Sequence, residues 1–562
     1  MMAVMRLRTL GAFALAVLPL TAIAKSAPKP EASLGRIEFP VTGSEESRRH
    51  FLRGMLAMHS FWYEEARDEF RAATATSPTF AMGYWGEALT HYHPVWGGED
   101  LAASRAVMAK LPTEAKLTER EQGFIEAARL LFGEGDRQYR WTAYATALRN
   151  LHKRYPADDE AAVLYAVALL GEVTNELYDE GGKPGFRRYA EAGAIALDVL
   201  AHNPDHPGAA HYVIHAFDDT EHAILALPAA RRYGKIAPEA SHALHMPSHT
   251  FVQLGMWPEA EQANDASWAA SDAWVRRKKI DPSYHDHHTL AWLEAVSLEQ
   301  GKRRKAYEVV QRALADVKAV RDEPAWMRVI YLHIATDYLI ESDDWSRLDE
   351  LIAPLATREP SAVDIGSSTT QPPPPTCHPA AARNAKAQQI ETATLTWLKG
   401  VAALARKDAA SANRFADALA KVAATMEKHD RDGWRGGELE LRGRAAALRG
   451  DEKAGIAQLR AAIALEERTP PTDPVQGVTA RERLGDILLA GGHAKEALEE
   501  YRRALEMHPR RGRALWRAAQ AATAANDSSA SAYWSELGVV WQHADADQPG
   551  LDELHRALAS KP

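Results

Sequence analysis

Residues 478–511 read VTARERLGDILLAGGHAKEALEEYRRALEMHPRR, and this stretch decides the fold. Leu484 and Gly485 stand in its first helical half, and Ala497, Tyr501 and Ala504 stand in its second. Alternating small and large residues at these positions let two antiparallel helices pack closely. The proline at position 509 then ends the second helix, because proline cannot continue it. The stretch predicts a helix-turn-helix unit.

The same offsets recur near the N-terminus, so the unit is repeated along the chain. The matching residues there are Gly54, Ala66, Phe70, Ala73 and Pro78. Weaker copies keep the frame through prolines that close successive units, namely Pro156, Pro204 and Pro238. The period of about 34 residues and these positions resemble the tetratricopeptide repeat (TPR). We therefore expect an all-α fold, a TPR α-solenoid of helix-turn-helix repeats.

One interruption divides the repeats into two predicted arrays. Residues 357–385 lose the pattern and include Ser367, Ser368 and four consecutive prolines from Pro372, which is typical of a linker. We place an N-terminal array at 46–356 and a C-terminal array at 386–562. Solenoids expose a long concave surface, which predicts a protein or peptide partner in the grooves.

The N-terminus has the features of an export signal. Arg6 and Arg8 precede an apolar stretch from Leu10 to Ile23, and Ala22-Ile-Ala24 fits a small-x-small cleavage site. We predict a signal peptide at 1–24, cut after Ala24, and an N-terminal extension at 25–45. The apolar stretch is short for a transmembrane helix. The sequence therefore predicts an exported protein, periplasmic or secreted, that does not span the membrane after cleavage.

The overall composition narrows the function classes. The formal net charge of −9 argues against a nucleic-acid-binding surface. Cys377 is the single cysteine, so the chain forms no intramolecular disulfide. No phosphate-binding P-loop and no strand-borne G-x-G-x-x-G is present, which leaves nucleotide-dependent chemistry without a motif.

Two histidine pairs stand at equivalent positions in neighbouring repeats. Counting each unit from the third residue after its closing proline puts His211 and His215 at positions 5 and 9. His245 and His249 take the same two positions in the next unit. Residues four apart share one face of a helix, so each pair presents two imidazoles to one point. In tetratricopeptide repeats, the resemblance implies that these positions face the concave groove.

A shared transition-metal site follows from these positions. Adjacent packed helices lie about 8–10 Å apart, so imidazoles from both can reach one ion. His288 opens the first helix of the intervening unit, and His91 comes from an earlier unit. All-nitrogen ligation suits transition metals, and we expect copper or zinc first and iron as an alternative.

Further polar residues are weaker ligand or outer-sphere predictions. Metal-bound histidines usually donate their second N–H to a carboxylate or carbonyl group. The weaker set comprises Glu87, His93, Asp218, Asp219, His333 and Asp337. We place His222 and His242 outside the site.

Three runs extend the resemblance beyond the general repeat: Ala210-His211-Tyr-Val-Ile-His215-Ala, Ala243-Leu-His245-Met-Pro-Ser-His249, and His288-Thr-Leu-Ala-Trp-Leu-Glu-Ala. They are similar to a family of exported bacterial TPR proteins with paired histidine motifs. That resemblance covers most of the N-terminal half and implies the fold and the special status of the histidines. It implies no reaction.

Three functions remain open at this point. The first is an exported binding protein whose N-terminal groove holds a histidine-rich transition-metal site and whose repeats recruit a protein. The second is a metalloenzyme, a metal-dependent hydrolase or a copper or iron oxidase, that uses the same histidines on a small-molecule ligand. The third is a plain interaction scaffold without metal.

Overall fold

The computed structural model describes residues 34–96, 98–180, 186–320, 324–356, 380–467 and 477–559. The predicted signal peptide at 1–24 and residues 357–379 of the predicted linker lie outside these ranges. Both remain predictions. Of the predicted N-terminal extension, residues 34–44 lie before the first helix and bury Leu34, Ile37 and Phe39, with the Phe39 ring packed against Phe51.

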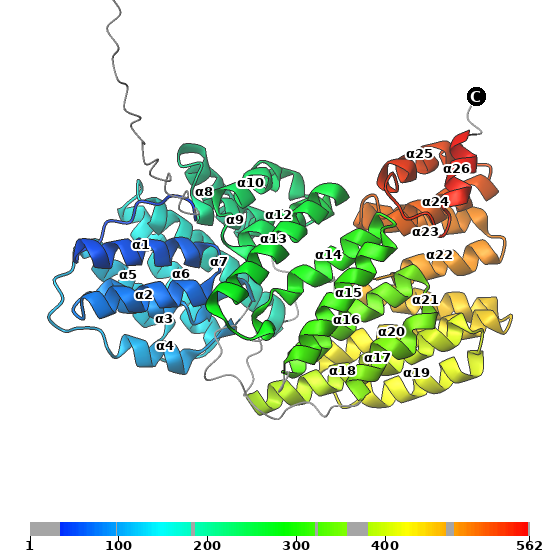
Figure 1. Cartoon of the computed structure of the whole chain (residues 1–562), viewed down its shortest axis with the longest axis horizontal. Coiled ribbons are helices and arrows are strands. Elements are labelled where there is room, and N and C mark those ends of the chain that lie inside the picture. Colours follow the sequence, from blue (N-terminus) through cyan, green and yellow to red (C-terminus); the bar gives the residue numbers. More distant parts are fainter. Residues whose placement is uncertain are drawn as a thin grey trace, which may run out of the picture.

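The described chain is an all-α array of antiparallel helices (Figure 1), as predicted. Its first part comprises α1 (Glu45–His59), α2 (Tyr63–Thr76), α3 (Ala81–Leu89), α4 (Leu101–Met108), α5 (Glu119–Leu131), α6 (Arg137–Arg154), α7 (Asp159–Glu180) and α8 (Phe186–His202). A short hairpin of β1 (Tyr92–His93) and β2 (Gly98–Glu99), with the 3-10 turn η1 (Pro94–Trp96), interrupts these helices.

The middle part carries the predicted site. It comprises α9 (Pro207–Ala216), α10 (Ala223–Ile236), α11 (Ser241–His245), α12 (Pro247–Gln253), α13 (Trp257–Lys278), η2 (Pro282–Tyr284), α14 (His287–Glu299), α15 (Arg303–Ala319), α16 (Ala325–Ser342), η3 (Trp345–Arg347) and α17 (Leu348–Ala356).

The last part comprises α18 (Ala380–Ala405), α19 (Ala409–Ala423), α20 (Lys428–Leu448), α21 (Glu452–Glu466), α22 (Ala480–Ala490), α23 (Ala494–Met507), α24 (Gly512–Ala524), α25 (Ala530–Val540) and α26 (Leu551–Ala559). Helices on the two sides of the predicted linker pack together, because Leu398 and Ala402 of α18 join the core formed by α14 to α17.

The small and large positions of the repeat meet as the sequence predicts. A Cβ atom on Gly485 of α22 would lie 2.6 Å from Cζ of Tyr501 on α23, so only glycine fits against that ring. Gly54 of α1 meets Phe70 of α2 in the same way, with 2.7 Å to Cε1. Equal contacts at both ends of the chain confirm a single repeat type.

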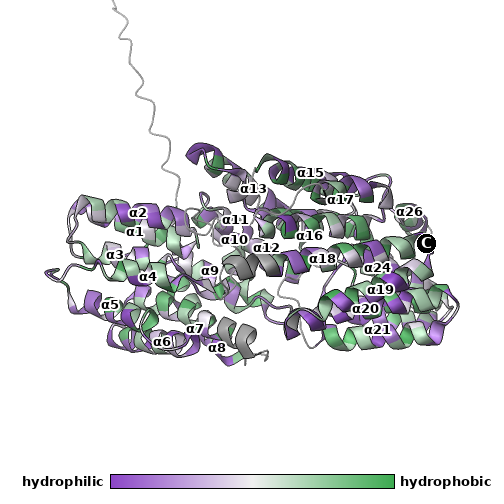
Figure 2. Cartoon of the chain, turned by 90° about the horizontal axis from the view of Figure 1, so that it is seen from below, coloured by the Kyte–Doolittle hydropathy of each residue, from purple (hydrophilic) through white to green (hydrophobic). Residues whose placement is uncertain are grey.

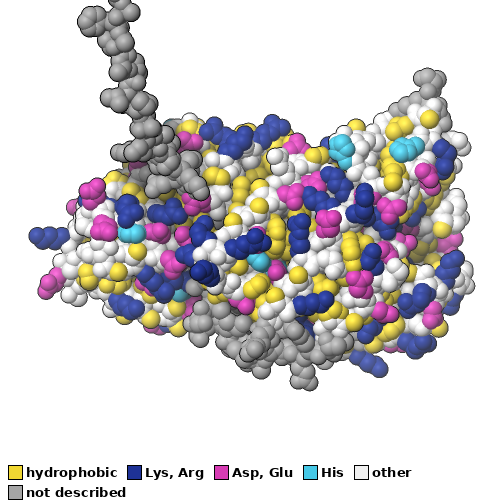
Figure 3. Space-filling view, viewed as in Figure 1, with side chains coloured by type: hydrophobic (Ala, Val, Ile, Leu, Met, Phe, Trp, Pro, Cys, Tyr) yellow, Lys and Arg dark blue, Asp and Glu magenta, His cyan; other side chains and the backbone are white. Residues whose placement is uncertain are grey.

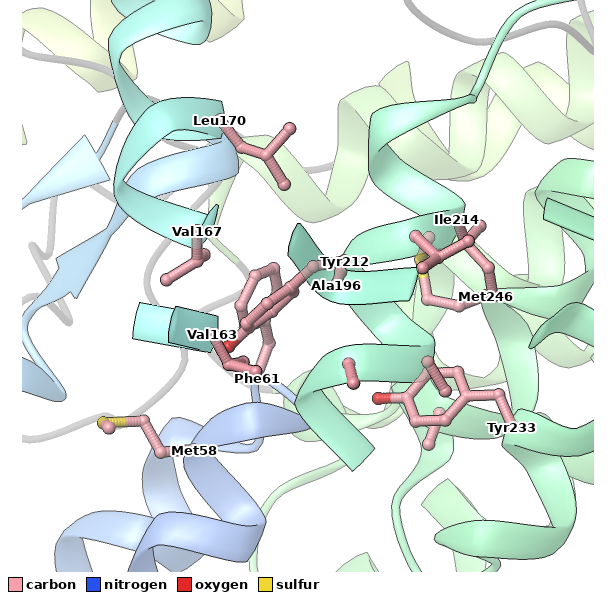
Figure 4. Close-up of a cluster of buried hydrophobic side chains, with 14 of the residues drawn as sticks. Met58, Phe61, Val163, Val167, Leu170, Ala196, Tyr212, Ile214, Tyr233 and Met246 are labelled. Atoms are coloured by element: carbon pink, nitrogen blue, oxygen red, sulfur yellow. The ribbon is translucent and has the colours of Figure 1, made fainter. Parts of the chain in front are cut away.

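The apolar faces of these helices are buried in cores that run along the array. Figure 2 shows hydrophobic and hydrophilic residues alternating around the helices, as amphipathic helices require. The largest core cluster extends from Leu34 to Leu554 and joins the N-terminal helices to α24 to α26. Figure 4 shows part of it, with Phe61 and Tyr212 packed against each other beside Val163. This core fixes α9 against α1 and α7.

The C-terminal helices close back on the middle of the chain. The indole Nε1 of Trp257 donates to the carbonyl oxygen of Arg510 at 2.8 Å, and the Arg510 guanidinium donates to the carbonyl oxygen of Gly255. The backbone N–H of Gly512 donates to Glu299, and α14 lies against α24 (Figure 1). The last repeats therefore pack on α12 to α14 as well as on their neighbours.

Two surface features complete the description. Basic and acidic side chains are interspersed over the face that Figure 3 shows. Within the described ranges, every helix is too short or too polar to cross a membrane.

Candidate metal centre

The first triad consists of His211 and His215 on α9 and His242 on α11. Nε2 of His211 lies 3.0 Å from Nε2 of His215 and 3.1 Å from Nε2 of His242. The helix begins with Pro207 at its first position, and the side chain of His206 accepts the N–H of Ala209 as its cap. This start sets the register that turns His211 and His215 toward α11.

The second triad consists of His245 on α11, His249 on α12 and His288 on α14. Nε2 of His245 lies 3.1 Å from Nε2 of His249, and the rings of His245 and His288 have centroids 4.8 Å apart. Pro247 has no N–H and separates α11 from α12, but Met246 keeps helical dihedrals. The pair therefore keeps the i, i+4 arrangement across the break.

The outer ring nitrogens are held by hydrogen-bond acceptors. Nδ1 of His211 donates to the carbonyl oxygen of His59 at 2.7 Å. Nδ1 of His249 donates to the Asp218 carboxylate at 2.6 Å. Nδ1 of His245 donates to Oδ1 of Asn264 at 2.7 Å. The Asn264 amide is oriented by its own N–H, which donates to the carbonyl oxygen of Ala260.

These bonds assign the tautomers of His245 and His249. In the neutral form of both rings the proton stands on Nδ1, and the two Nε2 lone pairs face each other at 3.1 Å. Two facing lone pairs repel unless a proton or a metal ion lies between the rings. Two nitrogens bound to one zinc ion at about 2.0–2.1 Å in tetrahedral geometry are separated by about 3.3–3.4 Å. The observed spacing is close to that of a metal-bound pair.

Four of the six rings are also kept in the neutral form that metal ions require. Burial lowers the pKa of His211, His242 and His245 well below the usual range, and neighbouring histidines lower it further. Burial and His249 lower the pKa of His215 to about 3. Neutral imidazoles at physiological pH keep their Nε2 lone pairs available.

An aromatic ring packs against each triad. The Phe61 ring lies 4.3 Å from the His211 ring and stacks on His215 and His242 at 5.7 and 5.5 Å between centroids. Phe61 has φ of +52°, a conformation that bulky residues rarely adopt. Trp292 of α14 stacks on His249 at 4.2 Å. These rings leave the imidazoles little freedom to turn.

A third histidine cluster lies beneath the first triad. His59, Glu160 and His206 are fully buried, and the Glu160 carboxylate lies 2.9 Å from Nε2 of His59 and 3.3 Å from Nε2 of His206. Nδ1 of His206 accepts the N–H of Ala209, so its proton is on Nε2, facing Glu160. In this cluster the ring nitrogens that face the Glu160 carboxylate carry protons. The cluster anchors α9 and supplies the His59 carbonyl group to His211.

The structure brings five of the six predicted ligands together and leaves the sixth apart. His211, His215, His245, His249 and His288 form the two triads together with His242, whereas His91 belongs to neither. Burial lowers the pKa of His91 to about 4.

The weaker predictions fall into different places. Asp218 holds Nδ1 of His249, the outer-sphere role considered for it. Asp219 pairs with His222, Glu87 with Arg71, and the exposed His333 with Asp337. Nε2 of His93 donates to the Thr90 carbonyl oxygen at 3.1 Å and is therefore occupied by its own turn.

Sequence reasoning missed His242, His59, Glu160, His206 and Asn264. His242 precedes His245 by three residues, a helical spacing that could have drawn attention to it. It instead serves the other triad, because the two rings project toward different neighbours. His59 contributes a backbone carbonyl group, and a residue pattern cannot predict such a role.

Comparison with known proteins identifies no family. No family model matches the chain, and no curated protein matches it. Among solved structures, the Cut9 and Hcn1 complex of the APC/C is similar at 10% identity and a TM-score of 0.33, covering 84% of this chain and 76% of that one. An IFIT1 mutant with Gppp-AAAA is 12% identical at a TM-score of 0.30, covering 92% of this chain and 91% of that one. The P58(IPK) TPR domain is 11% identical at a TM-score of 0.21, covering 85% of this chain and 98% of that one. At such scores these likenesses carry no argument, and the repeat assignment rests on the helix packing described above.

Proposed function

We propose that this chain is an exported helical-repeat protein that binds transition-metal ions at the two histidine triads. The observation that carries the proposal is the 3.1 Å approach of the Nε2 atoms of His245 and His249, whose Nδ1 atoms are held by Asn264 and Asp218. Three imidazoles per triad with no carboxylate among them favour copper or zinc, with iron less suited. The N-terminal signal supports export, and the repeat grooves support a protein partner.

The test measures the metal content of the full chain purified from its export compartment. We expect tightly held copper or zinc in the native protein and loss of the metal of the second triad in a His245→Ala, His249→Ala double variant. The His493→Ala variant is the matched control, since His493 is exposed and pairs with Glu452 away from the triads. Native protein without any transition metal, and without uptake of added copper or zinc, would leave a plain interaction scaffold.

A second candidate function is catalysis at the same histidines. The observation that favours it is the ligand number, because three protein ligands leave a coordination position open for water or substrate. His288 is exposed, so a small-molecule ligand can approach the second triad. If the metal-loaded protein binds no exogenous ligand, catalysis at this site is excluded. A storage or structural metal site would remain, because it requires no exogenous ligand.

A further inference from the structure

The two triads follow one another in the chain and meet on one short helix. His242 and His245 lie on the same short helix, α11, but belong to different triads. The His242 and His245 ring centroids are 6.1 Å apart, and those of His215 and His249 are 6.3 Å apart. Distances across the boundary between triads thus fall in the range found within them, which runs from 4.7 Å for His211 and His215 to 6.4 Å for His249 and His288.

One carboxylate serves both triads. Asp218 follows α9, which carries His215, and binds Nδ1 of His249 on α12. This carboxylate therefore connects the end of α9, which carries two histidines of the first triad, to a histidine of the second.

The ligand set leaves positive charge to be balanced between the two positions. Both groups of three are neutral imidazoles, so two bound divalent ions would keep their full charge at short range. A small anion that binds both ions removes most of that repulsion, and each three-histidine position has room in its coordination for one more ligand.

We propose that the six histidines form one dinuclear centre in which two ions share a small bridging anion of the hydroxide or azide class. This inference rests on the metal binding proposed above. The anion enters from the side of His288, which is exposed, and of His215 and His242, which are partly exposed. Phe61 and Trp292 pack against the triads and restrict other approaches.

The experiment loads the full chain with copper(II) and follows its electron paramagnetic resonance. Copper(II) has one unpaired electron, and two ions joined by a bridging anion couple their spins. We expect two ions per chain and loss of most of the signal per copper at saturation. Azide should bind at one per two ions and shift the absorption of the centre.

Single-triad variants keep the result interpretable. His288→Ala replaces an exposed side chain, so folding should be unaffected, and the variant should bind one ion with the full signal. His493→Ala should behave as the native chain. Two ions with full, uncoupled signals would overturn the shared centre and leave metal binding standing, as would one ion per native chain. Absence of both copper and zinc binding would remove the proposed function itself.

Discussion

At the scale of single residues, the site depends on which nitrogen carries each proton. Asn264 is fixed by Ala260 and in turn fixes the tautomer of His245. Asp218 does the same for His249. An acceptor that holds the outer ring N–H of a histidine orients that ring and raises the basicity of its other nitrogen. Removal of either should weaken metal binding without removing a ligand.

We expect Asn264→Leu to lower the affinity for copper or zinc by about 10–100-fold, because the His245 ring loses the acceptor that holds its proton on Nδ1. Competition with a chelator of known affinity measures this change. Asn413→Leu is the control, since Asn413 lies far along the chain on α19 and donates only to the Ala409 carbonyl oxygen. Unchanged affinity in Asn264→Leu would show that the Asn264 bond does not orient the ligand.

Glu160 should give the protein an acid-sensitive contribution to stability. Burial raises its pKa, but His59 and His206 outweigh burial and lower the pKa to about 2. The unfolded value is about 4.3, so the stabilisation is complete above pH 4.3 and is lost as the pH falls toward 2. Glu160→Gln should lower the free energy of unfolding at pH 7 by about 3 kcal/mol.

Denaturant titrations at pH 7 and pH 3 measure both parts of this expectation. The difference between native chain and Glu160→Gln should shrink at pH 3. Glu126→Gln, at an exposed position on α5, should change stability by no more than about 0.5 kcal/mol. A pH-independent difference would mean that Glu160 does not act through its charge.

At the scale of elements, the geometry of the site depends on how closely α9 approaches α1. A Cβ atom on Gly208 would lie 2.5 Å from Nδ1 of His59 and 2.9 Å from Cγ1 of Val163. The missing side chain therefore lets the His59 carbonyl group reach His211. The same close approach brings the buried Glu160 cluster against the start of α9.

Gly208→Ala should lower the free energy of unfolding by about 1–3 kcal/mol, because overpacking forces the His59 ring or α9 to move. Metal affinity should fall with it. Gly436→Ala on α20 is the opposite case, since nothing lies within 4 Å of its Cβ position. That change should stabilise the helix by about 0.5–1 kcal/mol. Calorimetry of both variants measures these changes in the free energy of unfolding. Equal changes in Gly208→Ala and Gly436→Ala would contradict a close approach of α9 to α1.

Elements also show what the sequence could and could not predict. The repeat frame placed His211, His215, His245 and His249 on neighbouring helices, because small and large core positions recur at fixed offsets. It could not find the His59 carbonyl group, since the α1–α2 turn reaches the site from a distant repeat. The prediction that His242 lies outside the site was wrong, since His242 belongs to the first triad. The repeat frame gives positions along a helix but no distances between helices, so it could not reveal this.

At the scale of the whole molecule, the closure of the last repeats on α12 to α14 sets the cooperativity. Open solenoids gain stability mostly from nearest neighbours. Here Arg511 binds Glu299 of α14 at 3.0 Å and Glu341 of α16 at 2.6 Å, and it lies 3.5 Å from Glu482 of α22. One buried cation thus joins the middle of the chain to its end.

Arg511→Met should lower the free energy of unfolding by about 3–5 kcal/mol, because it leaves buried carboxylates without their cation. It should also separate one unfolding transition into two. Arg503→Met, which removes an exposed pair with Glu499 on α23, should cost about 0.3–0.5 kcal/mol. Urea titrations followed by both fluorescence and circular dichroism test this, and coincident single transitions in Arg511→Met would contradict it.

The bond between Trp257 and Arg510 also determines how the molecule responds to a pull on its ends. The two residues are 253 positions apart, so tension applied near residues 34 and 559 bypasses everything between them while the contact holds. Once it ruptures, the shielded segment can lengthen to about 850 Å when fully extended. A force–extension trace should therefore begin with one strong rupture at the Trp257–Arg510 contact, and the repeats between these two residues should unfold only afterwards.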